Sequence, residues 1–195
     1  MTAFITRCCT NRNVLAALAA ALLLIGTAPA RADGITVRQA VLVAGDNGYH
    51  LEADFGITLN PTLKDALQKG VAFYFVMEFD LSRPHFFGWF HERIASYEQQ
   101  YKLTYNALTR QYRVTIGAGT LFQNFSSLES ALGLLAHVRS GDIVPRDALQ
   151  ENVTYDAEVR LRLDTSQLPK PFQVNAIASR DWNANSDWYR WTVTR

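Results

Sequence analysis

The stretch Tyr49–Leu59, YHLEADFGITL, decides the fold because apolar and polar residues alternate along its whole length. Side chains of a β-strand point alternately to the two sides of a sheet, so this pattern predicts a strand with one buried face. Before it come the β-branched stretch Ile35–Ala44 and the pair Asn47-Gly48, which favours a tight hairpin turn. The domain is therefore predicted to open with a β-hairpin.

The same alternation predicts strands along the rest of the chain. Val71–Leu81 is apolar on both faces, which is typical of a central strand covered on both sides. Tyr97–Tyr105 and Gln111–Ile116, joined by the turn Asn106–Arg110, are expected to form a second hairpin. Three more strands are expected at Val153–Leu163, Phe172–Ala178 and Trp188–Thr194.

Two helices are predicted by their start signals. Asn60-Pro61 supplies an N-cap and a first-turn proline for a short helix that runs to Lys69. Ser126-Ser127-Leu128-Glu129 reads as a capping box, and the apolar stripe that follows extends this second helix to Val138, with Arg139 in its last turn. Asp142–Asn152 is expected to be a loop.

Together these elements predict a mostly β fold with about eight strands, hairpin connections and no alternation of strands with helices. The pattern favours an antiparallel β-sandwich, immunoglobulin-like in outline, with two short inserted helices. A half-open β-barrel is the alternative.

The N-terminus has the pattern of a signal peptide. Val14–Ile25 is a continuous apolar run, too short for the about 20 residues that a membrane-spanning helix needs. Small residues follow, so cleavage is expected after Ala32, or alternatively after Ala30. Residues 1–32 are therefore predicted to be a signal peptide and residues 33–195 a single secreted domain, unless the segment stays uncleaved as a membrane anchor.

Charge and cysteine content exclude several classes of protein. The chain has 19 Lys and Arg residues against 18 Asp and Glu residues, a net charge of +1, so no basic field exists to attract nucleic acid. Both cysteines, Cys8 and Cys9, precede the apolar run. Cleavage would leave a domain without disulfides, thiolate metal sites or a cysteine nucleophile.

No catalytic, cofactor-binding or metal-binding residues are predicted. The spacing of His85, His91 and Glu92 fits neither helical nor strand zinc sites, and His137 is expected at the end of the second helix. The carboxylate pairs that could suggest glycoside hydrolysis, Glu52 with Asp54 and Asp156 with Glu158, are explained more simply by pairing with cations on neighbouring strands.

Two sets of residues are candidates for recognition. Aromatic clusters could form an interaction patch if they are exposed, although large aromatics usually belong to the core. Arg110, in a hairpin loop, and Arg113 are candidate anion contacts, because guanidinium groups match carboxylates and phosphates. The candidate interaction patch consists of Phe86, Phe87, Trp89, Trp182, Trp188 and Trp191.

Four strings, in this order and spread over the domain, resemble the domain-of-unknown-function family 4390. They are LTYNALTRQYRV (Leu103–Val114), FSSLESALGLL (Phe125–Leu135), RLRLDTSQLPKPFQV (Arg160–Val174) and RDWNANSDW (Arg180–Trp188). The resemblance implies a secreted protein of Gram-negative bacteria with no established activity. It also implies a gene that often lies beside those of a nitrogen-regulation-type membrane sensor kinase and its response regulator.

These observations lead to three hypotheses of function. The first is a periplasmic, non-catalytic binding or accessory module for a membrane sensor kinase or another envelope protein. The second is an envelope scaffold or assembly factor. The third, a hydrolase of envelope polymers, is disfavoured by the missing nucleophile and metal motifs, and it requires a cleft with converging acids. If the N-terminal segment is not cleaved, the domain would face the periplasm from the inner membrane.

Overall fold

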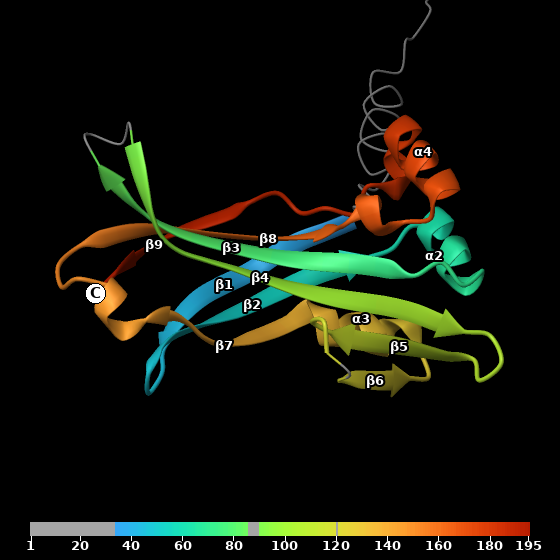
Figure 1. Ribbon diagram of the computed structural model, residues 1–195, viewed down its shortest axis with the longest axis horizontal. Coiled ribbons are helices and arrows are strands. Elements are labelled where there is room, and N and C mark those ends of the chain that lie inside the picture. Colours follow the sequence, from blue (N-terminus) through green and yellow to red (C-terminus); the bar gives the residue numbers. More distant parts are fainter. Residues whose placement is uncertain (1–33, 86–89, 120) are drawn as a thin grey trace, which may run out of the picture. The chain divides into compact units, whose positions relative to one another are not determined.

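The computed structural model describes residues 34–85, 90–119 and 121–195, which belong to one compact unit. These residues form two antiparallel sheets packed face to face, so the predicted β-sandwich is confirmed (Figure 1). The sheets have three and six strands, an imbalance that the immunoglobulin domain does not have. The predicted signal segment, residues 1–32, lies outside the described residues.

The smaller sheet has the strand order β1-β2-β7 and contains the predicted first hairpin. At the hairpin turn, the N–H of Gly45 donates to the carbonyl of Gly48 at 2.7 Å. On β2, Leu51, Ala53 and Phe55 are buried as the alternation predicts. The strands are β1 (Gly34–Ala44), β2 (Gly48–Thr58) and β7 (His137–Pro145).

The larger sheet has the order β6-β5-β4-β3-β8-β9, so β3 lies inside it, as predicted for Val71–Leu81. The turn after β4 is shaped by Asn106, whose Oδ1 accepts hydrogen bonds from the N–H groups of Leu108 and Thr109. The strands are β3 (Phe73–His85), β4 (Phe90–Asn106), β5 (Gln111–Ile116), β6 (Phe122–Phe125), β8 (Thr154–Leu163) and β9 (Tyr189–Thr194).

The core lies between the facing sides of the two sheets. Side chains of β3 that face the smaller sheet are almost inaccessible to solvent, and those of β8 meet them from the next strand. Helix α3 (Leu128–Ala136) contributes the buried side chains of Ala131 and Leu135 and contacts strands of both sheets. Burying apolar surface of this extent is the main favourable term in folding.

Helix α2 (Pro61–Gln68) confirms the first predicted helix. The side chain of Asn60 caps it by accepting from the N–H of Leu63 at 2.9 Å, and Pro61 occupies the first turn. The second helix, α3, begins one residue later than the predicted capping box, because Ser127 rather than Ser126 accepts from the N–H of Ser130.

The predicted end of the second helix is wrong. Helix α3 ends at Ala136, and His137, expected in its last turn, is the first residue of β7. Pairing of Val138 and Val144 with β2 buries both valines, which a solvent-exposed loop would leave in water. The segment expected to be a loop therefore begins inside a strand and continues through the 3₁₀ turn η2 (Arg146–Ala148).

The strand predicted at Phe172–Ala178 is also wrong, because this segment is helix α4 (Lys170–Ala178). Proline is well tolerated in a first helical turn, so Pro171 starts the helix rather than preceding a strand. The ring of Phe172 packs on Trp182 with centroids 5.2 Å apart, and most of the helix is exposed. Two more 3₁₀ turns flank it, η3 (Thr165–Gln167) and η4 (Arg180–Trp182).

Helices α2 and α4 lie at the same end of the sandwich (Figure 1). Within the described ranges, no helix combines the length and the apolar character needed to cross a bilayer.

Among the helix caps, substitution of Asn60 is expected to lower the stability of the fold most. Its Oδ1 caps α2, and its Nδ2 donates to the carbonyl of Asp181 at 2.6 Å, which ties α2 to η4. Asn60→Ala should lower the free energy of unfolding by about 1–2 kcal/mol, measured by urea denaturation. Asn175→Ala, at an exposed helical position without a side-chain hydrogen bond in the structure, is the control and should change it little. Equal effects of the two changes would contradict the capping role.

Candidate functional site

A cavity of about 620 Å³ lies at the β3, β4, β8 and β9 strands. Most of its lining side chains lie on the face of the larger sheet that points away from the core. Asp80 and Ser82 of β3 are paired with Glu158 and Asp156 of β8, and their neighbours in β3, Phe79 and Leu81, point into the core. We refer to this hollow as the outer-face cavity.

A β-bulge brings two cations to this cavity. Leu81 pairs with Ala95, but Ser82 pairs with Arg93, so Ile94 is an extra residue in β4. An extra residue reverses the side to which the following side chains point. Strict alternation from Tyr97 would place Arg93 and His91 on the core side, whereas the bulge places both in the cavity lining.

Each carboxylate in the cavity has a basic partner from another strand. The Arg93 Nε lies 3.2 Å from Asp80 Oδ1, the Arg190 Nε donates to Glu158 Oε2 at 2.8 Å, and the His91 Nε2 lies 3.8 Å from Asp156 Oδ2. Three carboxylates face two guanidiniums, so the cavity carries about one negative charge when His91 is neutral.

Two polar atoms of residues that line the cavity are buried without a hydrogen-bond partner in the described part of the chain. One is Asp80 Oδ1, whose approach to Arg93 lacks hydrogen-bond geometry despite the short distance. The other is Nε1 of Trp191, a half-buried side chain that packs against Phe79 and Tyr189. Trp191 pairs with Ala157 on the core side of the sheet, so only Asp80 Oδ1 offers unused hydrogen-bonding capacity on the cavity side.

A second cluster on the same face holds a buried acid between two arginines. Glu78 is 8% exposed and accepts hydrogen bonds from the Nε groups of Arg160 and Arg162 on β8. Burial by itself would raise the pKa of Glu78, but the hydrogen bonds and charges of the two arginines outweigh it and hold this pKa below 4.5. The guanidinium of Arg160 also stacks 4.4 Å from the centre of the Trp188 ring.

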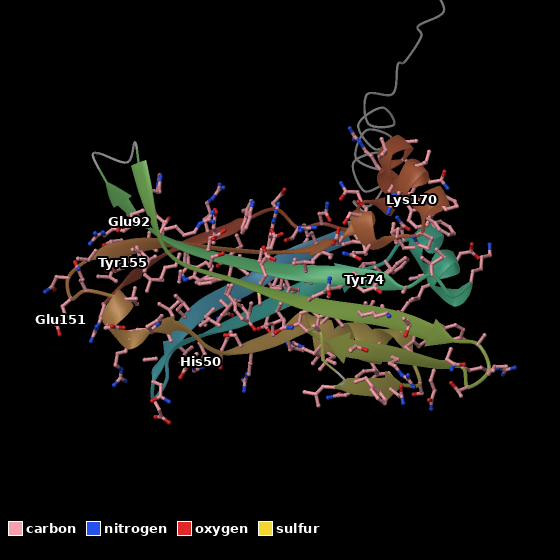
Figure 2. All side chains as sticks on the ribbon, in the orientation of Figure 1. His50, Tyr74, Glu92, Glu151, Tyr155 and Lys170 are labelled. Carbon is pink, nitrogen blue, oxygen red and sulfur yellow. The ribbon has the colours of Figure 1, made fainter. Side chains whose placement is uncertain are left out.

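Arg83 of β3 forms a salt bridge with Glu92 of β4 at 2.7 Å. Figure 2 labels Glu92 on β4. No group of three or more His, Cys, Asp or Glu side chains in the described ranges is arranged to hold a metal ion.

A comparison with protein-family models identifies the family of this domain. The family model described as "Domain of unknown function (DUF4390)" matches residues 32–192. The chain belongs to this family. Searches of curated proteins and of solved structures find no match. Membership in the DUF4390 family assigns no activity, so the function of this DUF4390 protein has to be argued from its own residues.

The tryptophans of the candidate interaction patch lie in different surroundings in this DUF4390 domain. Trp182 is buried, with 6% of its surface exposed, whereas Trp188 and Trp191 are half-buried. Of the three, Trp191 alone lines the outer-face cavity. The remaining members, Phe86, Phe87 and Trp89, lie outside the described residues.

The two candidate anion contacts are both exposed but differ in their setting. Arg110 adopts a left-handed backbone conformation, with φ of 55°, in the turn between β4 and β5. Arg113 on β5 lines a separate hollow of about 380 Å³, and its Nε donates to Asn124 Oδ1 on β6 at 3.0 Å. Their binding of an anion remains a prediction.

The carboxylate pairs singled out in the sequence have cross-strand partners in the structure. Asp54 contacts His137 of β7 at 2.7 Å, and Glu52 lies 3.5 Å from Arg139. Asp156 and Glu158 of the other pair both line the outer-face cavity. The sequence analysis did not identify Asp80, Arg93 and Arg190 as members of this site. The β-bulge that places Arg93 there cannot be predicted from the alternation of apolar and polar residues.

The Glu78 cluster predicts a pH-dependent contribution to stability. Because the pKa of Glu78 is lower in the folded state than in the unfolded chain, its contribution is present above about pH 4.5 and is lost as the pH falls through the folded-state pKa. Glu78→Gln should lower the free energy of unfolding at neutral pH by about 2 kcal/mol. The difference from the native protein should shrink as the pH falls below about 4.5.

Urea denaturation at several pH values measures this effect. Glu98, the exposed neighbour of Glu78 on β4, provides the control Glu98→Gln, which should leave the stability nearly unchanged at every pH. A constant difference between the native protein and Glu78→Gln down to acid pH would refute the assignment.

Proposed function

We infer that this protein is a non-catalytic binding or accessory module of the bacterial cell envelope. In this proposal the outer-face cavity holds a polar segment of an envelope partner, and a membrane sensor kinase is the first partner to test. Export to the periplasm through residues 1–32, or anchorage to the inner membrane by the same segment, is part of the proposal. It is supported by the signal-peptide pattern and by the genomic neighbourhood that the family resemblance implies.

The observation that carries the proposal is the chemistry of the outer-face cavity. Its volume of about 620 Å³ lies within the range of small-molecule pockets and accommodates several side chains of a docked segment. Alternating acids and bases on its walls can pair with both donors and acceptors, and Asp80 Oδ1 has no hydrogen-bond partner among the described residues. A polar segment with mixed charge therefore fits the cavity better than an apolar one.

The alternative role, that of an envelope scaffold, would use the same cavity without changing the activity of a kinase. An accessory module and a scaffold would bind different proteins in the cell, so the identity of the bound protein distinguishes them.

Hydrolysis of an envelope sugar polymer is a second candidate, because one specific observation favours it. Asp80, Asp156 and Glu158 converge on one cavity, as glycoside hydrolysis requires of its acids. Against it, each of these carboxylates already lies beside a basic side chain, whereas a general acid must be free to hold and transfer a proton. Binding without catalysis is therefore the better-supported function.

Site-specific photo-cross-linking in living cells tests the proposed function. A benzophenone amino acid at Thr192, an exposed residue of the cavity lining, should capture the partner. The same group at Thr194, on the same face of β9 but outside the lining, is the matched control. Capture of the sensor kinase at Thr192 alone would support the accessory role, and capture of other envelope proteins would support the scaffold. Capture of no protein at Thr192 would refute the proposal.

Filling the cavity should abolish its function without breaking an ion pair. Thr192→Trp is expected to reduce kinase output to the level of the gene deletion, because the indole occupies the space of the docked segment. Thr194→Trp should leave kinase output unchanged. A reporter gene under the response regulator measures the output, and equal output from both variants would contradict a role for the cavity in signalling.

Incubation of the purified protein with peptidoglycan tests the hydrolase alternative. Binding without catalysis predicts no release of reducing ends. Release that disappears in Asp156→Asn and Glu158→Gln would instead establish hydrolysis.

A further inference from the structure

The free edge of β6 differs from the other sheet edges of this protein. An exposed edge offers unpaired N–H and C=O groups, and proteins usually protect it with charges, prolines or bulges. Edge strand β1 has Arg38 and a register shift next to it, β7 has two register shifts and Pro145, and β9 has Arg190. Apart from its shortness, β6 (Phe122–Phe125) has none of these protections.

The backbone groups that face this edge follow from the ladder with β5. The N–H of Ile116 donates to the carbonyl of Leu121 at 3.2 Å, which makes these residues a hydrogen-bonded pair. Such pairs alternate with non-bonded pairs along an antiparallel ladder, and the register of β5 with β6 is unbroken. The N–H and C=O groups of Phe122 and Asn124 therefore point to the free edge.

A cation without an acidic partner lies above this edge. The Arg113 guanidinium stacks over the Phe122 ring, 4.4 Å from its centre, so it extends from β5 across β6. Asn124 Oδ1 holds it in place by accepting from its Nε. Arg93, Arg160 and Arg190 of the same sheet each pair with a carboxylate, whereas no carboxylate within the described ranges forms a salt bridge with Arg113.

The other side chains of β5, β6 and the adjoining hollow are apolar or uncharged. Phe122 is 52% exposed and Leu121 is 77% exposed. The hollow of about 380 Å³ beside Arg113 is lined by hydroxyl and amide side chains, including Thr104 and Gln111. Neither β5 nor β6 contains an acidic residue.

We propose that the β6 edge binds an extended, acidic segment of a partner protein as an added strand. Backbone hydrogen bonds to Phe122 and Asn124 supply affinity, and an acidic side chain of the segment pairs with the Arg113 guanidinium. An apolar side chain two residues from this acid packs on the exposed Phe122 ring. Strand addition of this kind takes its specificity from alternate side chains, here the acidic and apolar ones on the outer face.

Charge argues against a second copy of this chain as the occupant. Pairing two β6 edges about a two-fold axis would bring two Arg113 side chains to the same face of one continuous sheet. With no carboxylate on β5 or β6 of either copy, this arrangement is repulsive. A partner that supplies the missing negative charge is favoured instead.

This surface is distinct from the outer-face cavity. Strand β6 is one edge of the six-stranded sheet and β9, which lines the cavity, is the other. Loss of binding at one surface therefore leaves the other intact, and the two proposals can fail separately.

The test uses two fluorescently labelled peptides. The protein is purified from the cells that produce it, in the form in which those cells leave it after any cleavage of the N-terminal segment. The acidic probe is acetyl-TTVTETVTT-amide, which reads alike in both strand directions and places its glutamate and two valines on one face. The basic probe, acetyl-TTVTKTVTT-amide, replaces the glutamate with lysine. Fluorescence polarisation should show that the acidic probe binds about fivefold more tightly, the upper end for one exposed ion pair.

Charge reversal at Arg113 provides the decisive variant. Arg113→Glu should invert the preference, so that the basic probe binds more tightly than the acidic one. Arg180→Glu, which reverses the same charge at an exposed arginine of η4 for which the structure shows no salt bridge among the described residues, is the matched control and should keep the original preference. Circular dichroism verifies that both variants are folded.

Hydrogen exchange measured by NMR tests the backbone contacts without any mutation. Adding the acidic probe should slow exchange at the N–H groups of Phe122 and Asn124, which face the edge. The N–H groups of Gln123 and Phe125, already directed at β5, should change less. Equal affinity of the two probes, absence of binding, or protection at Phe122 and Asn124 that grows with protein concentration and without probe would each overturn the proposal.

Discussion

Burial of β3 is the constraint on which the rest of this structure depends. Its core-facing side chains, from Phe73 to Leu81, are excluded from solvent, and this requires a second layer over the strand. The smaller sheet and helix α3 provide that layer, while β4 and β8 complete the hydrogen bonding of β3 on its two sides. Once β3 is central, the opposite faces of β3, β4 and β8 form one surface, on which charged side chains follow Tyr74 and Val76 along β3.

That surface concentrates charge near the middle of the sheet. Glu78 lies on it at 8% exposure, which is tolerable only because Arg160 and Arg162 satisfy both of its carboxylate oxygens. In the outer-face cavity, Asp80 and Arg93 form the same kind of ion pair between neighbouring strands. The site is therefore an extension of the pairing that makes a charged sheet face stable.

Parts of the fold with a strong local pattern could be predicted from the sequence. Strict alternation located β2 and β8, and the Asn60-Pro61 signal located α2. The errors lie where the local signal is ambiguous. His137 continues an apolar helical stripe yet begins β7, because pairing with β2 buries Val138, and Pro171 starts helix α4 although prolines also end strands. In the site, the sequence pattern singles out Asp156 and Glu158, whereas it gives no signal for Asp80, Arg93 and Arg190.

The sequence by itself determined the fold class, the paired strands of both hairpins and the family, since these depend on alternation, turn residues and motifs that lie close together in the chain. Only the tertiary structure decided which polar residues meet. Arg93 reaches Asp80 because a single extra residue, Ile94, turns the strand over, and Arg113 crosses β6 because of the register with Phe122 and Asn124. Register and bulges are set by packing between residues distant in the sequence, so no local pattern encodes them.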